Sequence, residues 1–105
     1  MRINGKDYEL RYGMNTLCIM CDNGIDVMNM SSIVVNVKTI RELFMYGIKH
    51  DNKKITQNQA GDLIDDYLAE GGSFEALVDE VLEALGKSLG GNDKTEGESE
   101  DEEGK

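Results

Sequence analysis

The feature that most constrains this chain is a pair of amphipathic helix patterns separated by Gly71-Gly72-Ser73. The first pattern places apolar residues at the spacing of one helical face: Ala60, Leu63, Ile64, Tyr67 and Leu68. The second pattern does the same: Phe74, Leu77, Val78, Val81, Leu82, Leu85 and Leu89. Glycine ends a helix because it adopts the left-handed conformation without strain, and Ser73 can cap the next helix. Two helices joined by so short a turn are expected to form a hairpin with their apolar faces together.

A capping box marks the start of the first of these helices. Thr56 can accept a hydrogen bond from the amide of Gln59, and Gln59 can reach back to the amide of Thr56. Ile55 and Ala60 flank the box at the positions of a hydrophobic staple. Another helix is predicted upstream over Val37–His50, with one apolar face: Val37, Ile40, Leu43, Phe44, Gly47 and Ile48.

The first residues predict a β-hairpin. Asn4-Gly5 favours a tight turn between paired strands. Tyr8, Leu10 and Tyr12 alternate with charged residues, which predicts a second strand with one buried face. Such a hairpin is marginal alone, so it must pack on the helices or on another subunit.

A helix is expected to follow the hairpin and to end at Asn23-Gly24. Its apolar face comprises Met14, Leu17, Cys18 and Cys21. Ile25 is expected to pack back on this helix. Asp26, Ser31 and Ser32 are each able to cap a short helix. Ile33–Val37 has the composition of a strand, but we expect it to lead into the next helix.

Charge and composition separate a folded part from an acidic tail. The formal net charge is −10, and residues 92–105 contain seven acidic residues, two Lys and no large apolar side chain. Such a segment cannot bury enough apolar surface to offset the entropy of ordering, so we expect it to be disordered. The expected fold class is mainly α (α+β): one domain over residues 1–91, with an N-terminal hairpin and about four helices, and a disordered acidic tail over 92–105.

The acidic balance excludes several classes of partner. Nucleic acid and anionic membranes bind clustered Lys and Arg, which this chain lacks. No apolar run approaches the roughly 20 residues of a membrane span. The first residues show no secretory pattern. We therefore expect a cytosolic protein with reduced cysteines, no nucleic-acid or membrane partner, and a preference for basic proteins.

Motif-like matches in the chain do not amount to sites. Cys18-Ile19-Met20-Cys21 lacks both further zinc ligands and a βαβ context, so we expect two core cysteines. Gly86-Lys87-Ser88 lacks the leading glycine of a phosphate loop. Asp22-Asn23-Gly24 has Ile33 where a calcium loop has its acidic twelfth ligand. His50 is expected to contact free carbonyls at a helix end. We predict no catalytic residue, no cofactor and no metal.

Phe44, Met45 and Tyr46 are one candidate set for partner binding. Three consecutive helical residues are not expected to face one core, so we expect Met45 or Tyr46 to be partly exposed. The simpler interpretation is a set of ordinary core and boundary residues.

A second candidate set lies on the last helix at i, i+4 and i+8, and we name it the acidic strip: Glu75, Asp79 and Glu83. Like charges at this spacing repel slightly, and a solvated helix face is the simpler interpretation. The functional interpretation is a docking strip for a basic partner.

Four segments, taken in order, carry a likeness to a known family. They are Ile3–Cys18, which begins Ile3-Asn4-Gly5-Lys6, then Val37–Ile48, Ile55–Ile64 and Leu82–Ser88. Their order and spacing over residues 1–89 resemble tail assembly chaperones of long-tailed, siphovirus-like bacteriophages and prophages. The β-branched stretch at 33–37 departs from that pattern.

This resemblance implies a non-enzymatic role in virion morphogenesis. Such chaperones bind the tape measure protein, a long helical rod with exposed apolar faces, and keep it soluble. A longer product of programmed frameshifting helps to recruit tail tube subunits, and this chain would be the short, non-frameshifted product. The resemblance also implies a location in the host cytoplasm and absence from the mature virion. A homo-oligomer is compatible with it.

The alternative is an acidic protein-interaction module of non-tail function, such as a DNA mimic or an anti-host protein. A DNA mimic needs carboxylates spread over a rigid surface, whereas half of the net charge here lies in the tail. A small enzyme is the other alternative, and the residues offer no site for it.

Overall fold

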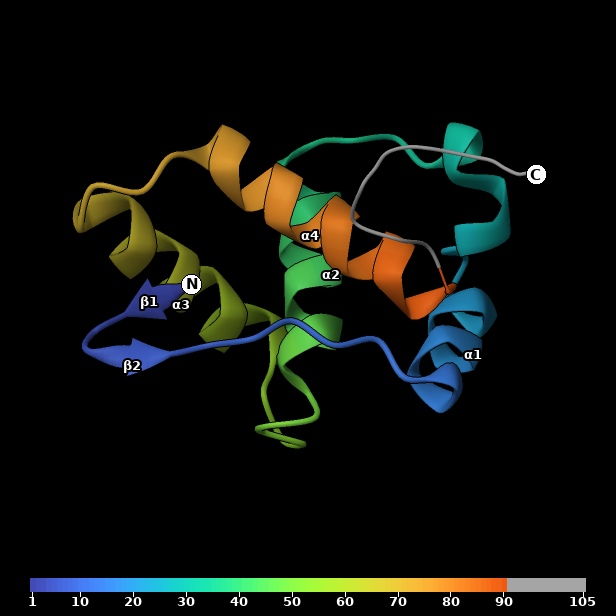
Figure 1. Cartoon of the computed structure of the whole chain (residues 1–105), viewed down its shortest axis with the longest axis horizontal. Helices are drawn as coiled ribbons and strands as arrows, with labels where there is room; N and C mark the ends of the chain where they lie inside the picture. The colour runs from blue at the N-terminus through green and yellow to red at the C-terminus, as the bar shows by residue number, and fades with distance from the viewer. Residues whose placement is uncertain (91–105) are drawn as a thin grey trace.

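The fold is mainly helical, and the computed structural model describes residues 1–90, apart from the side chain of Met30 (Figure 1). In chain order the elements are β1 (Arg2–Ile3), β2 (Lys6–Asp7), α1 (Met14–Asp22), a short 3₁₀ segment (Val27–Ser32), α2 (Val37–Ile48), α3 (Gln57–Ala69) and α4 (Phe74–Ser88). The predicted fold class is confirmed. The disorder expected over 92–105 and the domain limit at residue 91 lie outside the described residues.

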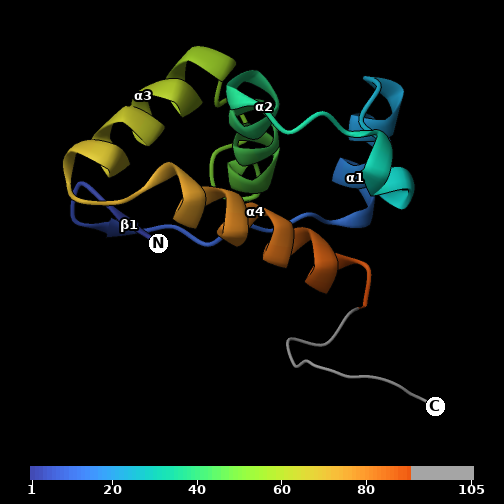
Figure 2. The same ribbon diagram turned by 90° about the horizontal axis from the view of Figure 1, so that it is seen from above.

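Helix α2 is the centre of the molecule, with α3 and α4 packed on different sides of it (Figure 2). Its buried residues are Ile40, Leu43, Phe44, Met45, Tyr46, Gly47 and Ile48. The predicted turn between α3 and α4 is present, and Gly71 has a φ of 102°. The apolar faces of the two helices, however, meet chiefly on α2 rather than on each other. The expectation that α3 and α4 pack directly on each other is therefore wrong, because both helices pack mainly on α2.

The N-terminal hairpin is shorter than expected. β1 and β2 pair antiparallel through Arg2 with Asp7 and Ile3 with Lys6. Asn4 and Gly5 have φ values of 55° and 79°, as the predicted tight turn requires. The chain after Asp7 has no strand partner among the described residues, so the predicted second strand stops there.

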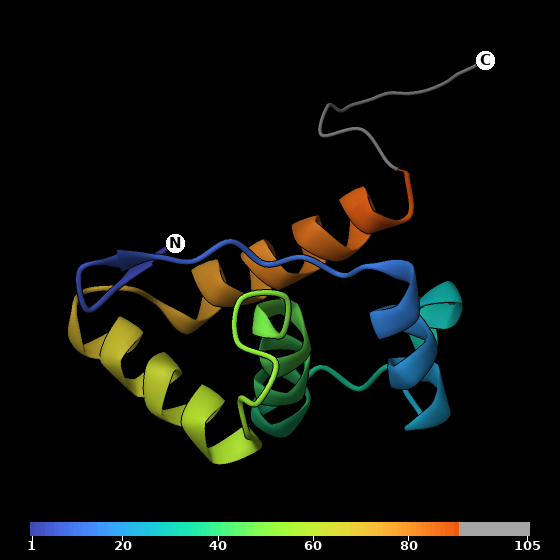
Figure 3. The same cartoon turned by 90° about the horizontal axis from the view of Figure 1, so that it is seen from below.

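The segment Tyr8–Tyr12 continues beside the end of α2 (Figure 3). The amide of Arg11 donates to the carbonyl of Gly47 at 3.0 Å, which ties the segment to α2. The predicted alternation is confirmed, because Leu10 and Tyr12 are buried and Tyr8 is half-buried. The Tyr12 hydroxyl donates to the carbonyl of Leu43 at 2.6 Å, and burial raises the pKa of this hydroxyl.

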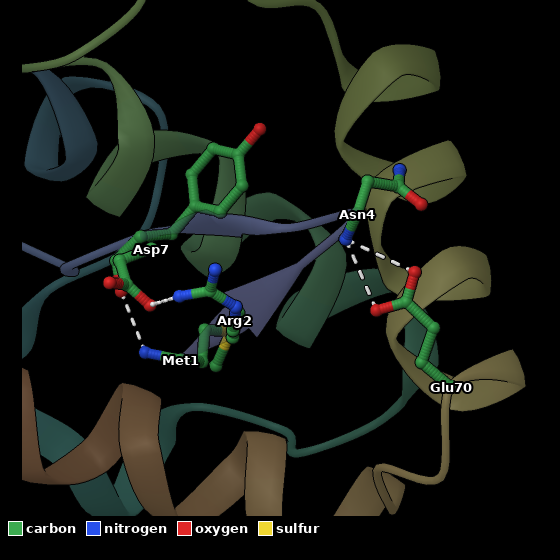
Figure 4. A network of polar contacts seen from close by, with 6 residues as sticks. Met1, Arg2, Asn4, Asp7 and Glu70 are labelled. Carbon is green, nitrogen blue, oxygen red and sulfur yellow. Dashed lines mark hydrogen bonds and ion pairs between the residues drawn. The ribbon is translucent and has the colours of Figure 1, made fainter.

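The hairpin is held against the C-terminal end of α3 (Figure 4). The amide of Asn4 donates to both carboxylate oxygens of Glu70 at 3.1 Å, and the Asn4 side chain donates to Asp66 at 2.7 Å. The amino group of Met1 donates to the carbonyl of Tyr8 at 2.7 Å. The contacts of Asn4 with Asp66 and Glu70 supply the external support that a two-stranded hairpin needs, because it is marginal alone.

The helix starts follow their local signals. Thr56 accepts from the amide of Gln59 at 3.1 Å, and the Gln59 side chain accepts from the amide of Thr56 at 3.1 Å, so the capping box is confirmed. Ser73 caps α4 by accepting from the amide of Ala76 at 3.1 Å. Asn36 caps α2 by accepting from the amide of Thr39. Ile55, at the staple position, is buried.

The predicted apolar face of α1 is wrong in part. Leu17 is buried, but Met14 is 67% exposed and both cysteines are exposed. The other buried residue of α1 is Met20. α1 lies at one end of the molecule, so only a narrow stripe of it meets the rest of the chain (Figure 1). Ile25 packs back as expected, because it is buried and its amide donates to Met20 at 2.9 Å.

Replacing Tyr12 with Phe should lower the free energy of unfolding by about 1 kcal/mol, because the Leu43 carbonyl loses a buried donor. Urea denaturation at neutral pH measures this change. Tyr8→Phe is the matched control, since no hydrogen bond of the Tyr8 hydroxyl is found within residues 1–90. Equal losses in the two variants would contradict the structural role of the Tyr12 hydroxyl.

The free energy of unfolding should also fall as the pH rises above about 10. The unfolded chain ionises Tyr12 at its ordinary pKa of about 10, while burial keeps the folded hydroxyl protonated to higher pH. The stability advantage of the wild-type chain over Tyr12→Phe, about 1 kcal/mol at neutral pH, should therefore shrink by up to about 1.4 kcal/mol per pH unit and reach zero before about pH 11. Urea titrations between about pH 9 and pH 11 measure it, and a constant difference would contradict the burial of the hydroxyl.

Candidate functional site

Exposed apolar side chains gather just before and at the start of α2. We name three of them the valine segment, with their exposed fractions: Val34 (69%), Val35 (56%) and Val37 (71%). Met28, in the preceding 3₁₀ segment, is also exposed. Exposed apolar surface of this kind is typical of a contact site for another protein.

The local structure explains why these valines are exposed. Residues 33–36 form neither a strand nor a helix, and α2 begins only after the Asn36 cap. Val37 is the first residue of α2 and lies outside the buried face, so its predicted core position is wrong. Within the described residues, no hydrogen bond involves the backbone of Val34 or Val35.

A groove of about 320 Å³ opens beside Val37, and we name it the α2/α3 groove. Its lining comes from three helices: Val37, Arg41, Asn58, Gly61, Asp62, Ile64, Asp65 and Phe74. The lining therefore combines apolar side chains with two carboxylates and one guanidinium. Such a mixture suits the side chains of another protein better than a catalytic reaction.

A larger groove of about 490 Å³, the N-terminal groove, runs between the extended segment 8–13 and the second half of α4. Its charged lining has both signs: Glu9, Arg11, Glu80, Glu83 and Lys87. Arg11 and Glu9 pair with each other at 3.1 Å. This groove is thus the larger of the two, and its lining also contains apolar side chains, among them Leu10, Tyr12 and Ala84.

The structure buries all three residues of the first predicted partner-binding set. Phe44, Met45 and Tyr46 are 0%, 7% and 6% exposed. The expected exposure of Met45 or Tyr46 is wrong, because α2 is covered on several sides and not on one. The Tyr46 hydroxyl accepts a hydrogen bond from the Asn23 side chain at 3.2 Å. The pKa of Tyr46 is raised, mainly by burial. A role of these residues in partner contact stays a prediction.

The acidic strip is exposed along α4, as the sequence predicts. Glu75 lies in the first turn, where a carboxylate favours the positive end of the helix dipole. Glu83 also lines the N-terminal groove. No observation tests partner binding by the strip, which stays a prediction.

The remaining candidate residues do not form a reactive cluster. Cys18 and Cys21 are free and exposed, so the expectation of two core cysteines is wrong. The Nε2 atom of His50 donates to the carbonyl of Glu9 at 2.6 Å, which is a carbonyl of the N-terminal segment and not of its own helix end. Within residues 1–90, no three His, Cys, Asp or Glu side chains lie close enough to hold a metal ion. None of the helices in that part of the chain has the length and apolar character of a membrane span.

The described residues form a mainly helical domain with exposed apolar residues and two grooves, features that are typical of a protein-binding module. The family model described as "Phage tail assembly chaperone protein, TAC" matches residues 1–96. The chain therefore belongs to the phage tail assembly chaperone family, which is non-enzymatic. The resemblance inferred from the residues is confirmed. No curated protein and no solved structure matches the chain.

Both thiols should react with an aromatic disulfide reagent in the native protein, because Cys18 and Cys21 are exposed on α1. Absorbance of the released thiolate should indicate two reactive thiols per chain without denaturant. The single variants Cys18→Ser and Cys21→Ser should each retain one reactive thiol per chain. Reaction only after addition of urea would mean that α1 packs with these residues inside.

Proposed function

We propose that this chain binds the tape measure protein of its phage and keeps it soluble before the tail tube forms. The proposal is supported by membership of the tail assembly chaperone family. The observation that carries it is the valine segment, whose three apolar side chains are largely exposed.

The physical basis is the coverage of an apolar stripe. A long amphipathic rod aggregates through its exposed apolar face unless another protein covers that face. A helix laid against the apolar surface of a folded domain is a recurrent solution. Several copies of this small domain are needed along one rod, which is compatible with contacts between copies.

The charge of the chain supports the proposal that it keeps the tape measure protein soluble. A net charge of −10 makes coated rods repel one another, which favours solubility. Residues 92–105 add seven carboxylates to each bound copy. The same charge disfavours nucleic acid as a competing partner in the host cytoplasm.

Recruitment of tail tube subunits is the later step of the proposed function. A longer frameshifted product would carry the recruiting domain, and the tube subunits would displace the chaperone as they assemble. The chaperone would then be absent from the mature virion. The acidic strip is our candidate contact for a basic surface on such a tail protein, because its three carboxylates are exposed on one helix.

The first predicted set takes an indirect part in this proposal. Phe44, Met45 and Tyr46 are buried, so contact with a partner would require α2 to unpack. We assign them the packing of α2 within the core and not direct contact.

The valine segment should be necessary for keeping the tape measure protein soluble. Co-expression of the tape measure protein with the variant Val34→Thr, Val35→Thr and Val37→Thr should shift it toward the pellet, because the shape is kept while apolar surface is lost. Centrifugation and gel quantification measure the soluble fraction.

The matched control removes exposed apolar surface elsewhere, with Met14→Gln and Ile19→Thr on α1. The soluble fraction of the tape measure protein should be the same with this control as with the wild-type chaperone. Tape measure protein that is equally soluble with and without the wild-type chaperone would contradict the proposed function itself.

A further inference from the structure

We propose that the α2/α3 groove binds one amphipathic helix whose apolar stripe is flanked by Lys or Arg. The inference rests on the proposed function to the extent that the tape measure protein supplies this helix. It adds the location of the contact and the chemistry of the partner face.

The apolar surface of the groove comes from three separate helices. Val37 is the first residue of α2, Ile64 belongs to α3, and Phe74 is the first residue of α4. Val37 is largely exposed, Phe74 is half-buried and Ile64 is buried, so the groove deepens from its mouth to its floor. Val34 and Val35 precede Val37 in the chain and are also exposed, although they do not line the groove.

The absence of a side chain at Gly61 keeps the groove open. A Cβ atom built at this position would lie 3.3 Å from the Cδ atom of Arg41, which is a tight contact. The neighbours of Gly61 on the same face of α3 also line the groove, at the i, i+4 and i+7 positions: Asn58, Asp62 and Asp65. The wall is therefore one helical face of α3 opposite Arg41 of α2.

The charges of this wall favour a basic partner. Asp62 and Asp65 are exposed, and within residues 1–90 neither carboxylate has a hydrogen bond or an ion pair. The other two acidic residues near the end of α3 differ, since Asp66 and Glu70 both bind Asn4 of the hairpin. The carboxylates of the groove are thus available to a partner.

Arg41 is the single cation in the lining, and its Nε atom is buried without a hydrogen-bond partner. It offsets only one of the two carboxylates of Asp62 and Asp65. An occupant with a flanking cation therefore meets attraction at the rim, whereas an acidic occupant meets two negative charges.

The size and shape of the site favour a helix over other ligands. A volume of about 320 Å³ is at the small end for a pocket that encloses a drug-sized ligand. A surface groove lined by three helices, with Val37, Ile64 and Phe74 as its apolar residues, is suited to the side chains that an amphipathic helix presents at i, i+3, i+4 and i+7. The N-terminal groove is larger, but its lining includes Arg11, Lys87 and the amino-terminal residue Met1, whose positive charges disfavour a basic occupant.

The test uses two fluorescein-labelled synthetic Leu/Ala helices with the same apolar stripe, one flanked by Lys and the other by Glu. Fluorescence anisotropy measures their binding to the full chain. The Lys helix should bind at least tenfold more tightly than the Glu helix at low salt. This Lys-over-Glu ratio of affinities should shrink at high salt because exposed charges are screened. Equal binding of the two helices, or binding of neither, would overturn the inference.

Variants locate the binding site within the full chain. Asp62→Asn with Asp65→Asn should reduce the Lys-over-Glu ratio several-fold, and Val37→Thr should weaken both helices. The matched charge control neutralises two exposed carboxylates outside this groove and outside the acidic strip, with Asp22→Asn on α1 and Glu80→Gln on α4, and it should leave the ratio unchanged. The same loss in both charge variants would indicate general attraction and overturn the site.

The failure of this inference is distinguishable from the failure of the proposed function. If the chaperone solubilises the tape measure protein but neither synthetic helix binds, the groove is wrong and the function stands. If the Lys helix binds through Asp62 and Asp65 but the tape measure protein gains no solubility, the groove stands and the function is wrong.

Discussion

Burial of α2 is the constraint on which the rest of the structure depends. Seven of its residues are buried, including the continuous run from Leu43 to Ile48. A helix that is apolar around most of its circumference must be covered from several directions. α3, α4 and the extended segment Tyr8–Tyr12 each supply one cover, and the Tyr12 hydroxyl bonds to the Leu43 carbonyl. The hairpin, in turn, is held in place through Asn4 and Glu70.

The same arrangement leaves apolar surface where the covering elements diverge. α3 and α4 spread apart from the Gly71 turn, so Phe74 and Ile64 border a groove instead of a closed seam. Val37 begins α2 outside the core, and Val34 and Val35, in the connection that precedes it, are also exposed. The proposed function needs apolar surface for a partner together with enough charge to keep the complex dispersed. This chain combines exposed valines with a net charge of −10.

Much of the secondary structure was predictable because its signals are local. The Thr56–Gln59 box, the Ser73 cap and the Asn4-Gly5 turn each depend on hydrogen bonds or dihedral angles within a few residues. The candidate site was less predictable. The composition of residues 33–37 stood out, but exposure of Val37 was not expected. Asp62 and Asp65 resemble any solvated helix face until the structure places them beside an apolar groove.

The sequence by itself determined which segments are helical, where the helices begin and end, and to which family the chain belongs. These properties depend on neighbours along the chain and on the order of its segments. Only the tertiary structure decided which helix faces are buried. Met45 and Tyr46 are covered because three elements surround α2, while Cys18 and Cys21 are exposed because α1 lies at one end. Periodicity shows that a helix has an apolar face, but burial depends on the number of elements packed around it.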